Sequence, residues 1–202
     1  GLIAMMHPEV YVAQTITADA NHFYRAIMDA NSFPGPAVVN VYTTCQPEHG
    51  VGDDQAQDHA RLARDTRTFP VLTYDPRRGD SMRERLSLAG NPDVTKDWSF
   101  DRQTGAARDF VTFARAEGRF ARQFDADGQP APLLARAQAE RLQYWRLLQD
   151  LAGITRDPLQ CRPQLMLQVR MQAGDEARDL ERYAIARHRL HQRAALSRAS
   201  SS

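Results

Sequence analysis

The sequence predicts an α/β protein in which a partial, parallel, open sheet is followed by helices. Two observations lead to this class. Within the first 75 residues, short β-branched segments alternate with helical segments, and strand, helix, strand in about thirty residues is typical of a right-handed parallel crossover. After residue 106 the apolar side chains recur at helical spacing instead.

The first strand is predicted at residues 10–14, which are β-branched and aromatic. Thr17 can cap a helix that runs to about residue 30, with Phe23 and Ile27 on one face. Two prolines and a glycine in residues 31–36 end that helix and lead into a second strand. We expect this second strand to be buried, with a polar loop beyond its carboxyl end.

The pattern then repeats once. Asp53 and Asp54 place negative charge where a helix N-terminus favours it, and the alanines of residues 55–66 allow that helix to lie close to a sheet. Residues 69–74 predict a third strand, in which Pro70 favours an edge or terminal position because it has no backbone N–H. The sheet is expected to end there.

The rest of the chain divides into three stretches. Residues 75–105 are rich in Pro, Gly, Asp and Arg and predict a long surface excursion that completes an α/β domain of residues 1–106. Residues 107–153 predict a helical pair packing on it, and residues 154–202 a basic helical tail of unknown role. The apolar positions expected to anchor these stretches are Leu86, Leu88, Trp98 and Phe100; then Phe110, Phe113, Phe120 and Phe124, interrupted by Glu117 and Gly118; then Leu133, Ala137, Tyr144, Leu148 and Leu151, with Gly153 as a stop.

Charge and cysteine content narrow the class of protein. Residues 1–154 carry 17 basic and 20 acidic side chains, whereas residues 155–202 carry 9 and 5. Cys45 and Cys161 are too few for a disulfide framework, which favours a reducing, cytoplasmic location. No apolar run reaches the ~20 residues that span a bilayer. The apolar start at Gly1 predicts the last turn of a helix and so a segment of a longer polypeptide.

The polar loop after the second strand contains Cys45, Glu48 and His49, at the position where open α/β sheets bind ligands. Cys45 could be a nucleophile activated by His49, a zinc ligand together with His49, one ligand of an iron–sulfur cluster, or an inert core thiol. Spacing alone does not choose among these. Asp53 and Asp54 are helix-capping charges first, although their oxygens would suit magnesium.

Six colinear stretches within residues 1–152 resemble one known family, the pyruvate and related 2-oxoacid:ferredoxin (flavodoxin) oxidoreductases, in the C-terminal part of their thiamine-diphosphate-binding domain. The stretches are Gly1-Leu2-Ile3-Ala4-Met5, Val10-Tyr11-Val12-Ala13-Gln14, Ala30-Asn31-Ser32-Phe33-Pro34-Gly35-Pro36, Cys45 with His49-Gly50, Phe69-Pro70 with Tyr74-Asp75-Pro76-Arg77, and Gly118-Arg119-Phe120.

The resemblance implies a partial parallel open sheet of thiamine-diphosphate-binding type. It also implies an enzyme that oxidatively decarboxylates a 2-oxoacid, pyruvate first, to the acyl-CoA with coenzyme A as cosubstrate. Thiamine diphosphate, magnesium and [4Fe-4S] clusters are the implied cofactors, and ferredoxin or flavodoxin accepts the electrons. In that family a cysteine at the position of Cys45 is the last of four ligands of the cluster nearest the thiamine.

The chain departs from the family pattern in two respects. Three residues separate Cys45 from His49, where better-known members have two, and the magnesium and diphosphate motif is absent. We therefore expect no catalytic residue in this segment and no activity of the segment alone. The implied partners are the remainder of a homodimeric oxidoreductase and its electron carrier, with no nucleic acid and no membrane. The competing hypothesis is a non-catalytic subunit-interaction module with a degenerate thiamine-type fold.

Overall fold

The computed structural model describes residues 1–157, so the predicted tail helix and Cys161 lie outside the described residues. The elements are α1 (Leu2–Met5), β1 (Tyr11–Ile16), α2 (Ala20–Ser32), β2 (Ala37–Tyr42), α3 (Gln46–His49), η1 (Asp53–Gln55), α4 (Ala56–Asp65), β3 (Leu72–Tyr74), η2 (Pro76–Arg78), α5 (Met82–Arg85), β4 (Leu86–Ser87), β5 (Ser99–Phe100), β6 (Ala107–Arg108), α6 (Phe110–Arg115), η3 (Gly118–Gln123) and α7 (Pro132–Leu151). Within the described range, no helix is long and apolar enough to cross a membrane.

The main sheet has the strand order β2-β1-β3-β4 and is mixed, not parallel throughout. The predicted crossover is confirmed, because β1 and β2 are parallel and α2 connects them, with Asp19 as its N-cap in place of Thr17. The implied parallel third strand is wrong: β3 runs antiparallel to β1, and β4 extends the sheet further. Pro70 lies just before β3, at a terminal position as predicted.

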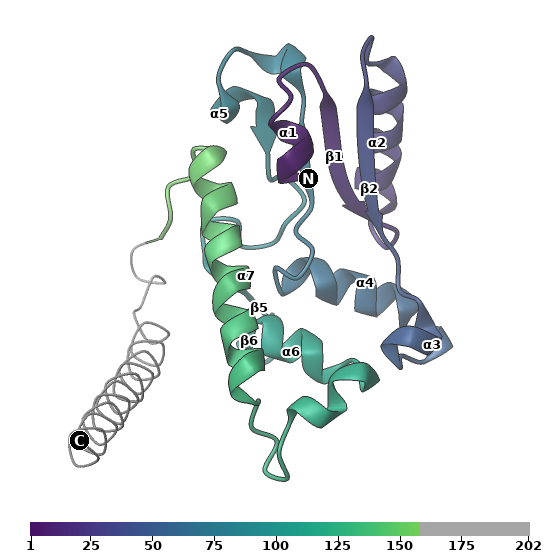
Figure 1. The fold of residues 1–202 in the computed structure, drawn as a ribbon, viewed down its shortest axis with the longest axis vertical. Coiled ribbons are helices and arrows are strands. Elements are labelled where there is room, and N and C mark those ends of the chain that lie inside the picture. The colour runs from purple at the N-terminus through teal and green to yellow at the C-terminus, as the bar shows by residue number, and fades with distance from the viewer. Residues whose placement is uncertain (158–202) are drawn as a thin grey trace, which may run out of the picture. The chain divides into compact units, whose positions relative to one another are not determined.

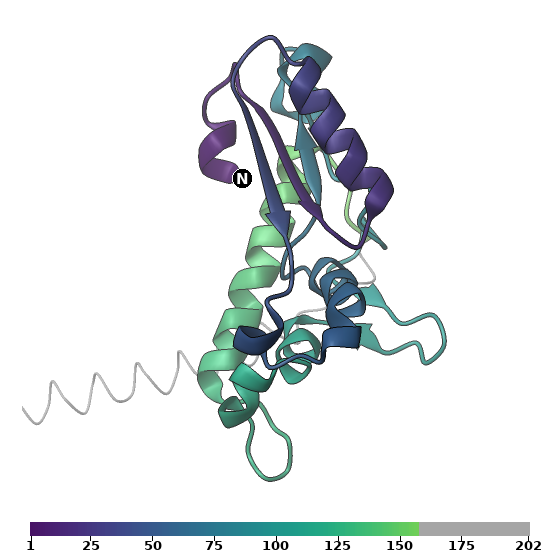
Figure 2. The same cartoon turned by 90° about the vertical axis from the view of Figure 1, so that its right-hand side faces the viewer.

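The position of α4 explains the reversal of β3. This helix lies beyond the carboxyl ends of β1 and β2 and does not cover a face of the sheet (Figures 1 and 2). After α4 the chain turns at Arg67, whose φ of 59° is left-handed, and Phe69 N bonds Ala63 O at 2.8 Å. The chain therefore re-enters the sheet from the end where the first two strands finish.

Strand β1 is the centre of the core, since all six of its residues are buried. On one face Tyr11 and Ala13 pack with Ala26 of α2. On the other, Val12 belongs to a cluster that includes Met5 of α1 and Trp145 of α7. Figure 2 shows α2 on one side of the strands and α1 and α7 on the other. The sheet is thus covered on both faces around β1.

Strand β2 does not fit the prediction of a buried strand. Ala37 and Asn40 are exposed and Val38 is 43% exposed. In the part of the chain that the structure describes, β2 pairs only with β1, so its other edge is free. Burial within the described residues therefore does not account for its apolar composition.

The C-terminal helices follow the predicted pattern with one exception. Phe110 and Phe113 are buried on α6, and Gly153, with a φ of 67°, ends α7 as predicted. Leu133, expected in the core, is 69% exposed, and Trp145 is completely buried on the same helix. The 75–105 excursion is anchored by Leu86 and Leu88, both buried, but it also contributes short helices and strands.

Candidate functional site

The loop after β2 is a single helical turn. Cys45 is the N-cap of α3, and His49 N donates to Cys45 O at 2.9 Å, closing that turn. The three residues between Cys45 and His49 are therefore the spacing that a hydrogen bond between residues i and i+4 of an α-helix requires. The Cys45 thiol is exposed, so its interpretation as an inert core thiol is wrong.

Two glycines hold this turn against the segment before α7. Gly50 ends α3 in the left-handed region, with a φ of 62°. A methyl group on Gly50 would lie 2.9 Å from Gly118 Cα, and one on Gly118 would lie 3.1 Å from Gly50 O. Such close approach of two backbones leaves no room for a side chain. Two stretches that carry the family resemblance, 68 residues apart, are thereby in contact.

Three side chains converge beneath this glycine contact. His49 comes from α3, His59 from α4, and Glu117 precedes η3. His49 Nδ1 lies 3.4 Å and His59 Nε2 lies 3.3 Å from Glu117 Oε1. The side chains are 13%, 3% and 0% exposed, respectively. A carboxylate and two imidazoles thus share one nearly water-free site.

The second ring nitrogen of His59 is held by hydroxyl groups. His59 Nδ1 lies 3.3 Å from both Tyr42 Oη and Thr44 Oγ1, and the Thr44 hydroxyl donates to Ala56 O at 3.2 Å. Because Thr44 gives its proton to that carbonyl, its oxygen accepts from Nδ1–H. Burial lowers the pKa of His59 to about 4, and burial, followed by the charge of Glu117, raises the pKa of Tyr42 to about 12. A neutral His59 with its proton on Nδ1 therefore has an unprotonated Nε2, 3.3 Å from Glu117 Oε1.

Glu117 is bound on one side only. Its Oε2 accepts from Arg119 Nε in a short ion pair. Its Oε1 has no hydrogen-bond partner, and neither has His49 Nδ1 or His59 Nε2, although all three atoms are buried. Proximity without hydrogen bonding means that no N–H points at the carboxylate oxygen. Buried polar atoms in this state are uncommon in native proteins.

The structure separates the residues that the sequence analysis placed in one loop. Within the described residues, the Cys45 side chain makes no hydrogen bond, and the group of possible metal ligands contains His49 without Cys45. Asp53 and Asp54 are exposed in the first turn of η1, but neither makes a capping hydrogen bond, since the N-caps of η1 and α4 are Gly52 and Gln55. His59 and Glu117 were not predicted. One feature of the sequence could have indicated Glu117. A carboxylate within a row of buried aromatic residues must either have a polar partner or end the row.

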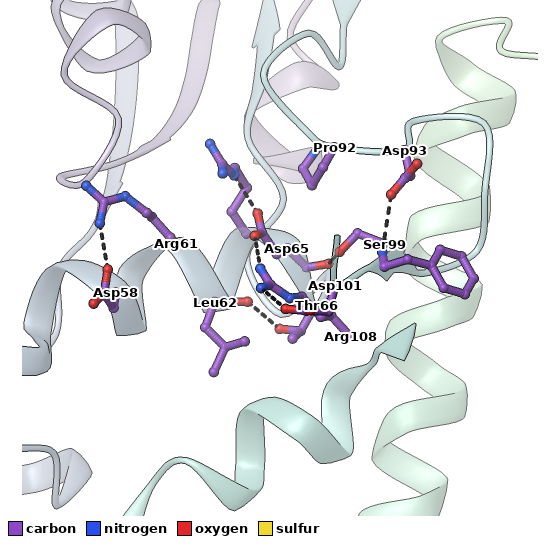
Figure 3. A network of polar contacts seen from close by, with 12 residues as sticks. Asp58, Arg61, Leu62, Asp65, Thr66, Pro92, Asp93, Ser99, Asp101 and Arg108 are labelled. Carbon is purple, nitrogen blue, oxygen red and sulfur yellow. Dashed lines mark hydrogen bonds and ion pairs between the residues drawn. The ribbon is translucent and has the colours of Figure 1, made fainter. Parts of the chain in front are cut away.

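A second polar cluster lies at the other end of α4. Arg64 pairs with Asp65 at 2.9 Å, and Arg108 pairs with Asp65 at 2.9 Å and with Asp101 at 2.6 Å (Figure 3). Ser99 donates to the backbone carbonyl of Asp65 at 2.8 Å. These residues line a cavity of about 610 Å³. Every one of these charges is paired, so the network explains how the β5–β6 hairpin is fixed to α4.

Fold and loop together define a mixed α/β segment whose candidate chemistry lies at the carboxyl ends of its two parallel strands, as in many α/β enzymes. No protein-family model matches the chain. A probable pyruvate-flavodoxin oxidoreductase of Escherichia coli (strain K12) is 36% identical over 93 residues, covering 46% of this chain and 8% of the relative. The pyruvate-flavodoxin oxidoreductase of Rhodospirillum rubrum is 31% identical over 156 residues, which cover 76% of this chain and 12% of the relative. The pyruvate-flavodoxin oxidoreductase of Klebsiella pneumoniae is 36% identical over 81 residues, which cover 39% of this chain and 7% of the relative.

These matches confirm the predicted resemblance. Over the matched residues, the chain belongs to the pyruvate-flavodoxin oxidoreductase family. It spans only about a tenth of the length of these relatives, between 7% and 12%.

Proposed function

We propose that this chain forms the C-terminal part of the thiamine-diphosphate-binding domain of a 2-oxoacid oxidoreductase, in which Cys45 provides one thiolate to a [4Fe-4S] cluster. The observation that carries the proposal is the exposed thiol at the carboxyl end of β2, on a turn fixed by the contact between Gly50 and Gly118. A ligand for a cluster shared with other parts of an enzyme needs both exposure and a fixed position.

The donor set agrees with a shared cluster. A [4Fe-4S] cluster needs four thiolates, whereas the whole sequence contains two cysteines. The other ligands must come from another part of the parent enzyme, so the segment alone should hold no cluster and show no activity. Cys45 fits the role of a single ligand because, in the described residues, no hydrogen bond occupies its sulfur.

The proposed reaction is the oxidative decarboxylation of a 2-oxoacid, pyruvate first, to the acyl-CoA. Thiamine diphosphate with magnesium supplies the carbanion chemistry when bound, and coenzyme A accepts the acyl group. To these groups we assign no residue of this chain. Its own contribution is to position the Cys45 sulfur by the helical turn of α3. Electrons then leave through clusters to ferredoxin or flavodoxin, in a cytoplasmic, homodimeric enzyme.

Exposed apolar side chains support the presence of further protein around this segment. Ile3 is 87% exposed, Met6 76%, Tyr24 65% and Val38 43%. They belong to α1, α2 and β2 or lie next to them in the chain. A non-catalytic subunit-interaction module would expose a similar surface, so the role of Cys45 is the property that separates the two functions.

The test is anaerobic iron and sulfide analysis of the full-length parent enzyme, with electron paramagnetic resonance of its reduced clusters. Cys45→Ser should remove or alter one cluster, that is about four iron atoms, and slow electron transfer to the carrier. Cys161→Ser is the matched control and should leave all clusters intact. Retention of every cluster by Cys45→Ser, with unchanged electron transfer, would favour the interaction module.

A further inference from the structure

We propose that His49, His59 and Glu117 bind a divalent transition-metal ion, with Zn²⁺ as the ion that suits them best. Each residue offers one ligand atom, and the three atoms lie within 4.8 Å of one another. Two imidazoles and one carboxylate are ligands that Zn²⁺ commonly takes. The site is independent of the cluster proposed for Cys45, since that thiol is not part of the group.

The spacing of the ligand atoms suits a tetrahedral ion. Zinc bonds to nitrogen and oxygen are about 2.0–2.2 Å long, so two ligand atoms on a tetrahedral centre lie about 3.3–3.6 Å apart. The distances from Glu117 Oε1 to His49 Nδ1 and His59 Nε2 are 3.4 and 3.3 Å. Two edges of the tetrahedron therefore already have the required length. The third pair, the two histidine nitrogens, lies within 4.8 Å and must come to the same length when an ion binds.

The unsatisfied atoms point to an ion and not to a network of hydrogen bonds. His49 Nδ1, His59 Nε2 and Glu117 Oε1 are all buried without a hydrogen-bond partner. They come from three separate elements and meet at one place. One cation between them would satisfy all three atoms at once, whereas a single proton can satisfy at most two.

The surroundings orient these ligands as in known metal sites. Histidine ligands almost always donate their other ring nitrogen to an oxygen, and His59 Nδ1 has Thr44 Oγ1 and Tyr42 Oη within 3.3 Å. Arg119 binds Glu117 Oε2, which leaves Oε1 as the single carboxylate ligand. The Arg119 side chain is 44% exposed, so solvent screens its repulsion of the ion.

The expected consequence is a clamp beneath the Cys45 turn. The ion would link α3, α4 and the residue before η3. The glycine contact joins only the end of α3 to the start of η3. Three protein ligands leave a fourth position for water. Metal binding should therefore raise the thermal midpoint of the chain and restrict the motion of the turn that carries Cys45.

The experiment uses the full 202-residue chain, stripped with a chelator and titrated with Zn²⁺ alone. Calorimetry and elemental analysis should give one ion per chain. Co²⁺ should bind at the same stoichiometry and show the visible absorption bands of a tetrahedral ion. Absence of binding by the stripped, folded chain would overturn the proposal.

Substitutions locate the ion. His49→Gln and His59→Gln should each weaken Zn²⁺ binding at least about 100-fold, and Thr44→Val about 10-fold, as removal of a group that orients a ligand typically does. His49 is the decisive position if the His59 variant does not fold, because its side chain is the more exposed of the two, at 13%. Unchanged affinity in folded His49→Gln would refute the site.

Matched controls exclude other sources of binding. His22 is a half-buried histidine outside the group, and His188 and His191 are the histidines of the tail. His22→Gln, the His188→Gln/His191→Gln double variant and Cys45→Ser should all retain wild-type affinity. Loss of binding in the double variant or in Cys45→Ser would move the ion to another place and overturn the assignment.

Discussion

Gly50→Ala should destabilise the chain by about 2–5 kcal/mol, the sum of two separate costs. The first is backbone strain, because a residue with a Cβ pays about 1–2 kcal/mol at the left-handed φ of 62° found at Gly50. The second is crowding, because the new methyl group would lie 2.9 Å from Gly118 Cα and 3.1 Å from its nitrogen. Overpacking against atoms that cannot rotate away costs about 1–3 kcal/mol.

Two further glycines separate these costs. Gly105 has a φ of 70° and no atom within 4 Å of an added Cβ, so Gly105→Ala should show strain alone, about 1–2 kcal/mol. Gly118 has no left-handed φ, but its added Cβ would lie 3.1 Å from Gly50 O. Gly118→Ala should therefore show crowding alone, about 1–3 kcal/mol. The assay is the free energy of unfolding from urea titration of each variant.

The comparison has a clear refuting result. If Gly50→Ala costs no more than Gly105→Ala, the two backbones are not in close contact and the turn that carries Cys45 is not fixed by it. The Gly50→Ala/Gly118→Ala double variant adds a check. A backbone shift that accommodates one methyl group also makes room for the other, so the two losses should not be additive.

Two other predictions concern buried charges. Arg67→Met should lower the free energy of unfolding by about 2–4 kcal/mol, because Nη2 of this fully buried side chain donates to two carbonyls of residues 92–93 at 2.7 and 3.0 Å. The control is Arg61→Met, at an exposed arginine. Equal losses of stability in thermal denaturation of the two variants would contradict a stabilising role of the Arg67 hydrogen bonds. The hydrogen bond from Arg77 lowers the pKa of Asp75, so its stabilisation is present above the unfolded pKa of about 3.9 and is lost as pH falls through the lower folded value. Asp75→Asn should therefore flatten the acid limb of stability against pH, and an unchanged limb would show that another group titrates there.

The features that the sequence predicted correctly are those with local causes. The crossover of β1, α2 and β2 follows from alternating composition and from the proline-rich turn after α2. Gly153 ends α7 because only a glycine adopts a φ of 67° without strain. The Cys45 turn was predicted at the carboxyl end of β2 because a polar loop follows an apolar strand. Each of these signals lies within a few residues of its effect.

The errors arise where tertiary neighbours decide. The antiparallel direction of β3 depends on α4 lying beyond the strand ends, which alanine spacing within that helix does not reveal. The exposure of β2 depends on which strands flank it, and its apolar sequence is the same whether or not another strand is present. Arg67 is buried at a left-handed φ, a position that composition would assign to solvent.

The candidate metal site could be predicted from the sequence only at Glu117. A carboxylate between two aromatic helical segments is costly to bury, so the position of Glu117 alone required a compensating partner. The sequence could not say which residues compensate it, because His49 and His59 lie 68 and 58 positions away and reach it through tertiary contacts. The packing of His59 on Phe113 brings His59 close, and the contact between Gly50 and Gly118 brings His49 close. The same contact fixes the backbone of the turn whose thiol faces solvent. One rigid element thus presents a buried ligand inward and an exposed cysteine outward, so His49→Gln and Cys45→Ser should impair different metal centres and neither substitution should mimic the other.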